Sequence, residues 1–237
     1  MFNKRQSLAL ITLTLLLAGI ADTGMAKSVL KFRPPSRGTL SITRGGASRG
    51  GSEPVNQLQM IAPQTSIGYT TDAYPTLMVY IPKTSAKMMV LRIRTADGKK
   101  TLFKKEMAVP PMPGVVRVNF ENASLPPLEV NSQYRWSVSL LANVVDRSTA
   151  TLIEGKLERI QPDAMLSQRL AKATPQEKAF LYAESGVWWN ALLTLDDLRK
   201  AQPDDVALSQ HWMSLLDSVG MGAIAPTPIL PTPDLKP

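Results

Sequence analysis

Apolar and polar side chains alternate with a period of two between Leu58 and Ile160. From Val116 to Phe120, for example, an apolar residue stands at every second position. Such alternation is typical of β-strands with one buried face, and short strands at this spacing are typical of an antiparallel sandwich. The pattern predicts a β-sandwich over residues 55–161, with strands at 58–62, 65–70, 76–81, 88–95, 100–106, 116–120, 134–140 and 150–160.

Two local signals refine this sandwich. Asp97-Gly98 is typical of the tight turn of a β-hairpin. Leu128 stands six residues before Tyr134, a spacing that resembles the tyrosine corner of immunoglobulin-like and fibronectin type III domains, in which the phenol bonds to upstream backbone. The alternative, that Tyr134 is an ordinary strand aromatic, stays open here.

From Pro162 the apolar spacing becomes helical and predicts an α-helical region over residues 162–220. Thr174 and Glu177 form the pattern of a capping box at the start of the second of four helices, and Gly220 suits the end of the last. We expect an α+β fold, an antiparallel immunoglobulin-like sandwich followed by a tetratricopeptide-like helical hairpin and a capping helix. The hairpin is indicated by Ala179, Tyr182, Gly186, Ala191, Leu195, Leu198 and Pro203.

The two ends of the chain differ from this middle. Lys4 and Arg5 precede an apolar run from Leu8 to Ile20, which predicts a signal peptide over residues 1–26. A transmembrane helix is the alternative, but the run is shorter than the ~20 residues that span a bilayer. We therefore expect an exported protein of the periplasm, outer envelope or extracellular space, with no transmembrane span after cleavage. The Pro-rich residues 221–237 predict an extended or disordered tail.

Positive charge gathers between the signal peptide and the sandwich. The chain has 27 Lys and Arg residues against 19 Asp and Glu, a net charge of +8. Residues 27–54 are rich in Gly, Pro and cations, which predicts a flexible basic arm that either contacts anionic glycan or lipid surfaces or merely stays solvated. Export argues against nucleic acid as a partner. The candidate contact residues are Lys31, Arg33, Arg37, Arg44 and Arg49.

Few residues suit catalysis or metal binding. The chain has no cysteine, and His211 is its only histidine. Ser48 lies in a Gly-x-Ser-x-Gly pattern, but within the arm rather than between a strand and a helix. Asp196 and Asp197 are adjacent, so on a helix they point about 100° apart and are not expected to form one site. We expect no catalytic residue, no metal and no cofactor.

Two neighbouring tryptophans, Trp188 and Trp189, are the most conspicuous side chains. Adjacent indoles on a helix are not expected to face the same core, so one is expected under Tyr182 and the other at the junction with the sandwich or on an exposed patch. They are therefore a candidate partner surface.

Several short runs are shared with a known family, the most specific being Leu181-Tyr182-Ala183-Glu184-Ser185-Gly186-Val187-Trp188. The others include Tyr80-Ile81-Pro82, Tyr134-Arg135-Trp136, Asp146-Arg147-Ser148 and Ala191-Leu192. On these runs the chain resembles the cyanobacterial domain of unknown function family 928 over residues 32–220. The resemblance implies an exported cyanobacterial protein and no established activity.

Taken with the lack of catalytic groups, these features favour a non-enzymatic exported binding or interaction protein, with another envelope protein or an anionic glycan or lipid surface as its partner. The alternative is a carbohydrate-binding module or a glycan-acting enzyme. A deep pocket that holds two carboxylates would support that alternative.

Overall fold

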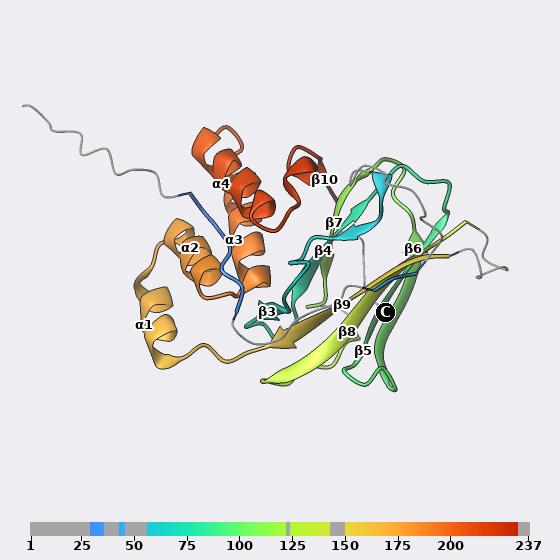
Figure 1. The fold of residues 1–237 in the computed structure, drawn as a ribbon, viewed down its shortest axis with the longest axis horizontal. Coiled ribbons are helices and arrows are strands. Elements are labelled where there is room, and N and C mark those ends of the chain that lie inside the picture. The colour runs from blue at the N-terminus through green and yellow to red at the C-terminus, as the bar shows by residue number, and fades with distance from the viewer. Residues whose placement is uncertain (1–28, 36–42, 46–55, 122–123, 143–149, 232–237) are drawn as a thin grey trace, which may run out of the picture.

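The computed structural model describes residues 29–35, 43–45, 56–121, 124–142 and 150–231, and within this part of the chain it contains two β-sheets and four α-helices (Figure 1). Alternating strands and the helical segment thus give the expected α+β class. The larger sheet has the order β1 (Thr43–Gly45), β9 (Thr151–Arg159), β8 (Ser132–Leu141), β5 (Met88–Thr95) and β6 (Thr101–Ala108), and β3 (Gly68–Thr70) also pairs with β9. The smaller sheet has the order β10 (Ile229–Leu230), β7 (Gly114–Asn119), β4 (Thr76–Ile81) and β2 (Gln59–Met60).

Both sheets are mixed, so the prediction of a purely antiparallel sandwich is wrong. β3 runs parallel to β9, with Gly68 opposite Leu157, and β10 runs parallel to β7, with Ile229 opposite Val115. Alternation shows which face of a strand is buried, but it carries no information about the direction of the neighbouring strand. Here the short strands β3 and β10 pair with β9 and β7, and neither is joined to its partner by a hairpin turn.

One hydrophobic core joins the two sheets. Phe103 of β6 meets Phe120, which follows β7, edge to face at 5.2 Å between ring centroids. The expected contact of Tyr134 is confirmed, since its phenol oxygen accepts a hydrogen bond from the amide of Glu129 at 2.8 Å. This contact fastens the entry of β8 to the loop before it.

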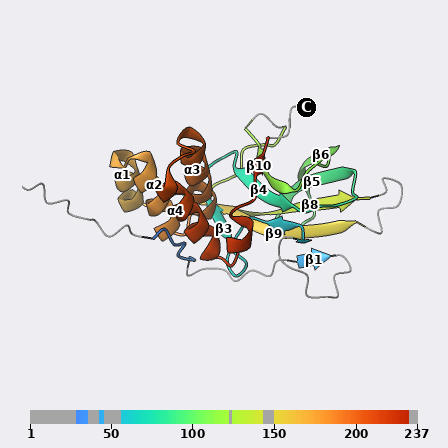
Figure 2. The ribbon, with the colours of Figure 1, turned by 90° about the horizontal axis from the view of Figure 1, so that it is seen from above.

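The helices lie together beside one end of the two sheets (Figure 2). The expected capping box is confirmed, because the Thr174 hydroxyl accepts from the Glu177 amide and the Glu177 carboxylate accepts from the Thr174 amide. α4 covers α3 with Trp212 and its buried neighbours. No described helix is both long and apolar enough to cross a bilayer. The helices are α1 (Ala164–Lys172), α2 (Pro175–Glu184), α3 (Trp188–Ala201) and α4 (Val206–Asp217).

The segment 29–35 is packed against the helices, which differs from the flexible arm expected there. The amide of Arg33 donates to the carbonyl of Ala183, and the amide of Phe32 donates to the hydroxyl of Ser218. Leu30 and Phe32 are buried, and Phe32 meets Trp188 edge to face. Two apolar side chains among cations therefore hold this part of the arm, a signal that the overall Gly, Pro and charge content concealed.

Both ends of the described chain also join the sheets. β1 comes from within the expected arm and pairs with β9, while β10 comes from the expected tail and pairs with β7. The signal peptide and the last residues of the tail, 1–28 and 232–237, lie outside the described residues.

Candidate functional site

A polar groove of about 600 Å³ lies between the loop after β3, the strand β7 and the helix α3. Each of the three elements contributes hydrogen-bonding side chains to its walls. The lining residues are Thr71, Asp72, Ala73, Tyr74, Thr76, Arg117, Asn119, Glu121, Asn190, Leu193, Thr194 and Asp197.

Asn190, a buried amide in the first turn of α3, shapes one wall of the groove. Its Oδ1 accepts hydrogen bonds from the Thr71 amide at 2.9 Å and from the Thr70 hydroxyl at 3.3 Å. Its Nδ2 donates to Asp72 Oδ2 at 3.1 Å. A buried amide is costly unless its donors and acceptors are paired, so this network fixes the loop against the helix.

Arg117 shapes the opposite wall, where it joins β7 to α3. Its NH1 nitrogen donates to Asp196 Oδ2 and to Asp197 Oδ1, both at 2.6 Å, and Lys200 donates to the same Asp196 oxygen at 2.7 Å. Arg117 therefore links the two aspartates, although only Asp197 lines the groove. The guanidinium from the sheet lies between them, so their different directions on the helix do not keep them apart.

These two aspartates differ sharply in exposure. The Asp196 side chain is 1 % exposed and that of Asp197 is 62 % exposed. Among the described residues, Asp196 Oδ1 has no hydrogen-bond partner. The buried Asp196 thus holds Arg117 from the protein interior, and the exposed Asp197 faces the groove.

Tyr182 of α2 is electrostatically coupled to the groove loop. Burial raises the pKa of its phenol, and the nearby negative charge of Asp72 raises it further, while a hydrogen bond with Thr71 acts in the opposite direction. The Tyr182 phenol therefore stays protonated beside Asp72, and its hydroxyl remains a hydrogen-bonding group at this edge of the groove.

The mouth of the groove combines an aromatic ring with exposed polar groups. Tyr74 is 38 % exposed, and Glu121 and Asp197 are exposed carboxylates. Within the described part of the chain, no three His, Asp or Glu side chains are arranged to hold a metal ion. Hydroxyls, amides and carboxylates around an aromatic ring suit a ligand with many hydroxyl groups.

Sequence reasoning missed this groove because its residues come from separate parts of the chain. The available signal was Asn190, a polar residue within the apolar start of a helix, which in a core requires hydrogen-bond partners.

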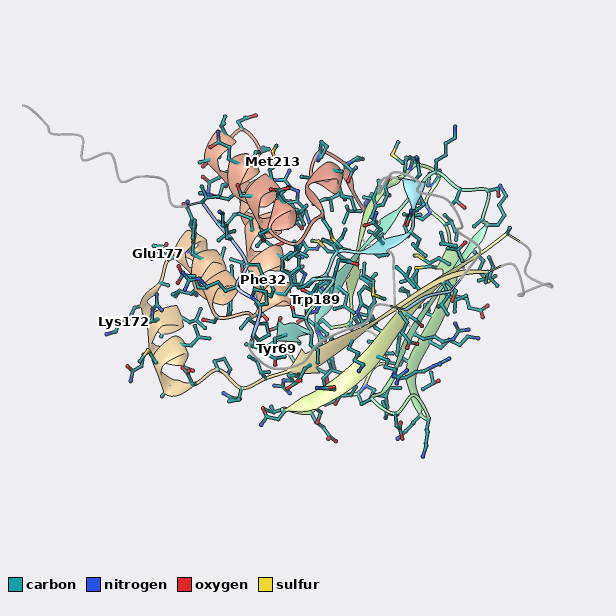
Figure 3. The ribbon with its side chains drawn as sticks, in the orientation of Figure 1. Phe32, Tyr69, Lys172, Glu177, Trp189 and Met213 are labelled. Carbon is teal, nitrogen blue, oxygen red and sulfur yellow. The ribbon has the colours of Figure 1, made fainter. Side chains whose placement is uncertain are left out.

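Trp188 and Trp189 do not form a surface. Both are fully buried in one core, so the expectations of an exposed patch and of two separate cores are wrong, whereas the expected junction with the sandwich is confirmed for Trp189. Trp188 Nε1 donates to the Ile61 carbonyl at 2.7 Å, and Trp189 meets Trp136 edge to face at 5.6 Å. Figure 3 shows Trp189 where the helices meet the sheets. Both indoles are covered because sheets and the segment 29–35 surround the first turns of α3.

The two basic candidates whose side chains are described, Lys31 and Arg33, are not part of the groove lining. Lys31 and Arg33 are exposed on either side of the buried Phe32. Arg44 lies in β1. Arg37, Arg49, Ser48 and the run Asp146-Arg147-Ser148 lie outside the described residues.

Comparison with known proteins gives a family and two partial structural similarities. A family model described as Domain of Unknown Function (DUF928) matches residues 44–229. No curated protein matches the chain. The solution structure of the fn3 domain of the human collagen alpha-1(XX) chain is 13 % identical, with 51 % of this chain and 94 % of that chain covered and a TM-score of 0.28. The crystal structure of an engineered protein is 12 % identical, with 44 % and 20 % covered and a TM-score of 0.30.

Proposed function

The chain belongs to the DUF928 family, and we propose that it is a non-enzymatic binding protein whose polar groove holds a neutral, hydroxyl-rich ligand of the oligosaccharide class. The observation that carries this proposal is the groove itself: a rigid, hydrogen-bonded concave wall with the exposed ring of Tyr74 beside it. An aromatic ring can stack on the apolar face of a sugar, while amides and carboxylates accept and donate to its hydroxyls.

The groove also contains carboxylates, which is the observation that favours a glycan-acting enzyme. Glycoside hydrolysis needs one carboxyl group as an acid and a second as a base or nucleophile. In this groove Asp72 accepts from Asn190 and Thr71, and Asp197 accepts from Arg117. Carboxylates that already hold the walls together favour recognition over proton transfer, so binding is the better proposal.

The setting of this activity is also a proposal. The charged and apolar pattern of residues 1–26 supports a signal peptide, and with the family resemblance it supports an exported cyanobacterial protein. The hydrogen bond of Tyr134 supports an immunoglobulin-like relation for the sheets. The packing of α2 on α3 supports a tetratricopeptide-like hairpin that serves as scaffold.

The proposal is tested by calorimetry with neutral oligosaccharides of glucose, mannose, xylose and N-acetylglucosamine. We expect Tyr74→Ala to weaken binding about tenfold, because a lost aromatic contact is worth ~1.5 kcal/mol. Glu121→Gln should weaken binding, whereas Glu129→Gln, an equivalent change at an exposed site outside the groove lining, should leave it unchanged.

No binding of any of these sugars by the wild-type protein would contradict the proposal, as would equal affinities of Glu121→Gln and Glu129→Gln. Release of reducing ends from a bound sugar, lost in Glu121→Gln, would establish the enzyme instead.

A further inference from the structure

Three cations stand directly opposite one another on the outer face of the larger sheet. Arg94 of β5 pairs in register with Arg135 of β8, and Arg135 pairs in register with Lys156 of β9. Their neighbours in the next register row, Ile93, Trp136 and Gly155, face the core. Since successive side chains alternate between faces, the three cations lie on the outer face, where they form a line across three strands spaced ~4.8 Å apart. We call Arg94, Arg135 and Lys156 the basic row.

The basic row is only partly neutralised by the rest of the protein, because Glu154 and Glu158 lie on the same face of β9, two positions before and after Lys156. Arg135 pairs with Glu154 at 3.2 Å and donates to the Ala96 carbonyl. Among the side chains that the structure describes, no carboxylate lies within ion-pair distance of Arg94 or Lys156. Like charges directly opposite each other on neighbouring strands are destabilising. A row of like charges on a flat sheet surface destabilises the fold, and a bound polyanion would neutralise it.

The surroundings of the basic row indicate the kind of polyanion. Thr101 and Gln133, two exposed positions on the same face, offer a hydroxyl and an amide oxygen, while the Gln133 amide nitrogen donates to Glu158 at 2.9 Å. No exposed large hydrophobic residue of the described chain lies in β5, β6, β8 or β9, so nothing on this face would insert into a bilayer. Phe103, Tyr134 and Trp136 of these strands are buried, so no ring is offered to nucleic-acid bases.

We propose that the basic row docks an acidic polysaccharide that crosses the strands, with its carboxylates or sulfates at Arg94, Arg135 and Lys156 and its hydroxyls at the polar positions beside them. The strand spacing is close to the length of one sugar in a chain, so successive cations can meet successive residues. β1 places residues 43–45 of the basic segment at the edge of the same sheet, next to β9. The basic row shares no residue with the groove and is independent of the function proposed for it.

The test compares two double variants of the full chain, each of which loses two positive charges. Arg94→Gln with Lys156→Gln removes the ends of the basic row, and Lys83→Gln with Lys172→Gln removes two exposed lysines outside this face. Binding to immobilised polygalacturonate is measured at low salt, with phosphatidylglycerol vesicles and single-stranded DNA as alternative ligands.

We expect the first variant to bind polygalacturonate about tenfold more weakly than wild type, since it loses two exposed ion pairs that each strengthen binding by at most about fivefold. The second variant should stay within about twofold of wild type, a change inside the scatter expected of surface charges. The thermal midpoint of the first variant should be unchanged or raised, because opposed like charges have been removed. Equal affinities of the two variants, or tighter binding of wild type to vesicles or DNA than to polygalacturonate, would overturn the proposal.

Discussion

Two glycines of the larger sheet allow bulky core side chains to approach the backbone. A Cβ at Gly68 would lie 2.6 Å from Trp189 Nε1, and a Cβ at Gly155 would lie 2.6 Å from Met60 Sδ. The distances are equal, but the neighbours differ. The indole is a rigid ring packed edge to face on Trp136, whereas a thioether has rotatable bonds and adapts to new volume.

The two substitutions to alanine should therefore differ in cost. We expect Gly68→Ala to lower the free energy of unfolding by about 1–3 kcal/mol, because the buried ring has no room to move. Gly155→Ala should lower it by less than about 1 kcal/mol, because Met60 can move aside. Urea unfolding of both variants measures the difference. If Gly155→Ala were as destabilising as Gly68→Ala, the rigidity of the indole would not be the controlling factor.

At the scale of elements, α3 connects the groove to both layers of the fold. Its first turn holds the β3 loop through Asn190, and its third turn holds β7 through Asp196 and Arg117. Close by, the Arg199 guanidinium lies 4.7 Å from the centre of the Trp212 ring. Burial lowers the pKa of Arg199, and the charge of Asp196 acts in the opposite direction.

Substitution of the two aspartates separates the structural contact from the exposed one. Asp196→Ala should lower the free energy of unfolding by about 3 kcal/mol, since it leaves Arg117 and Lys200 without their buried acceptor. Asp197→Ala should lower it by less than about 1 kcal/mol, since its side chain is mostly exposed. Thermal or urea unfolding measures both changes. Equal small effects would show that Asp196 does not join α3 to β7.

The existence and type of most elements could be read from the sequence, but the short strands β1 and β10 and the assembly of the elements could not. The period of two located β4, β5 and β8, and the capping box located α2, because those signals are local. The direction of β3 and β10 depends on partners far along the chain, which alternation does not encode. The groove was missed for the same reason, since Asn190, Arg117 and Tyr74 meet only after the helices pack on the sheets.

At the scale of the whole molecule, segments from both ends of the described chain complete the fold. Residues 29–35 pack on the helices, β1 extends the larger sheet, and β10 extends the smaller one (Figure 2). These contacts hold the helices and sheets in one core. A groove formed between helix and strand is rigid only if both layers are held together, so the whole fold supports the site.

The central claim is that this groove binds a neutral oligosaccharide, and backbone chemical-shift mapping of the labelled full-length protein tests it most directly. Titration with the oligosaccharides named above should shift the amide signals of Thr71, Asp72, Tyr74, Asn119 and Thr194, with Arg94 and Lys156 unchanged. The same titration on Tyr74→Ala should need a higher sugar concentration for equal shifts. Saturating sugar that leaves the groove signals unmoved, or that moves only signals elsewhere in the protein, would contradict the claim.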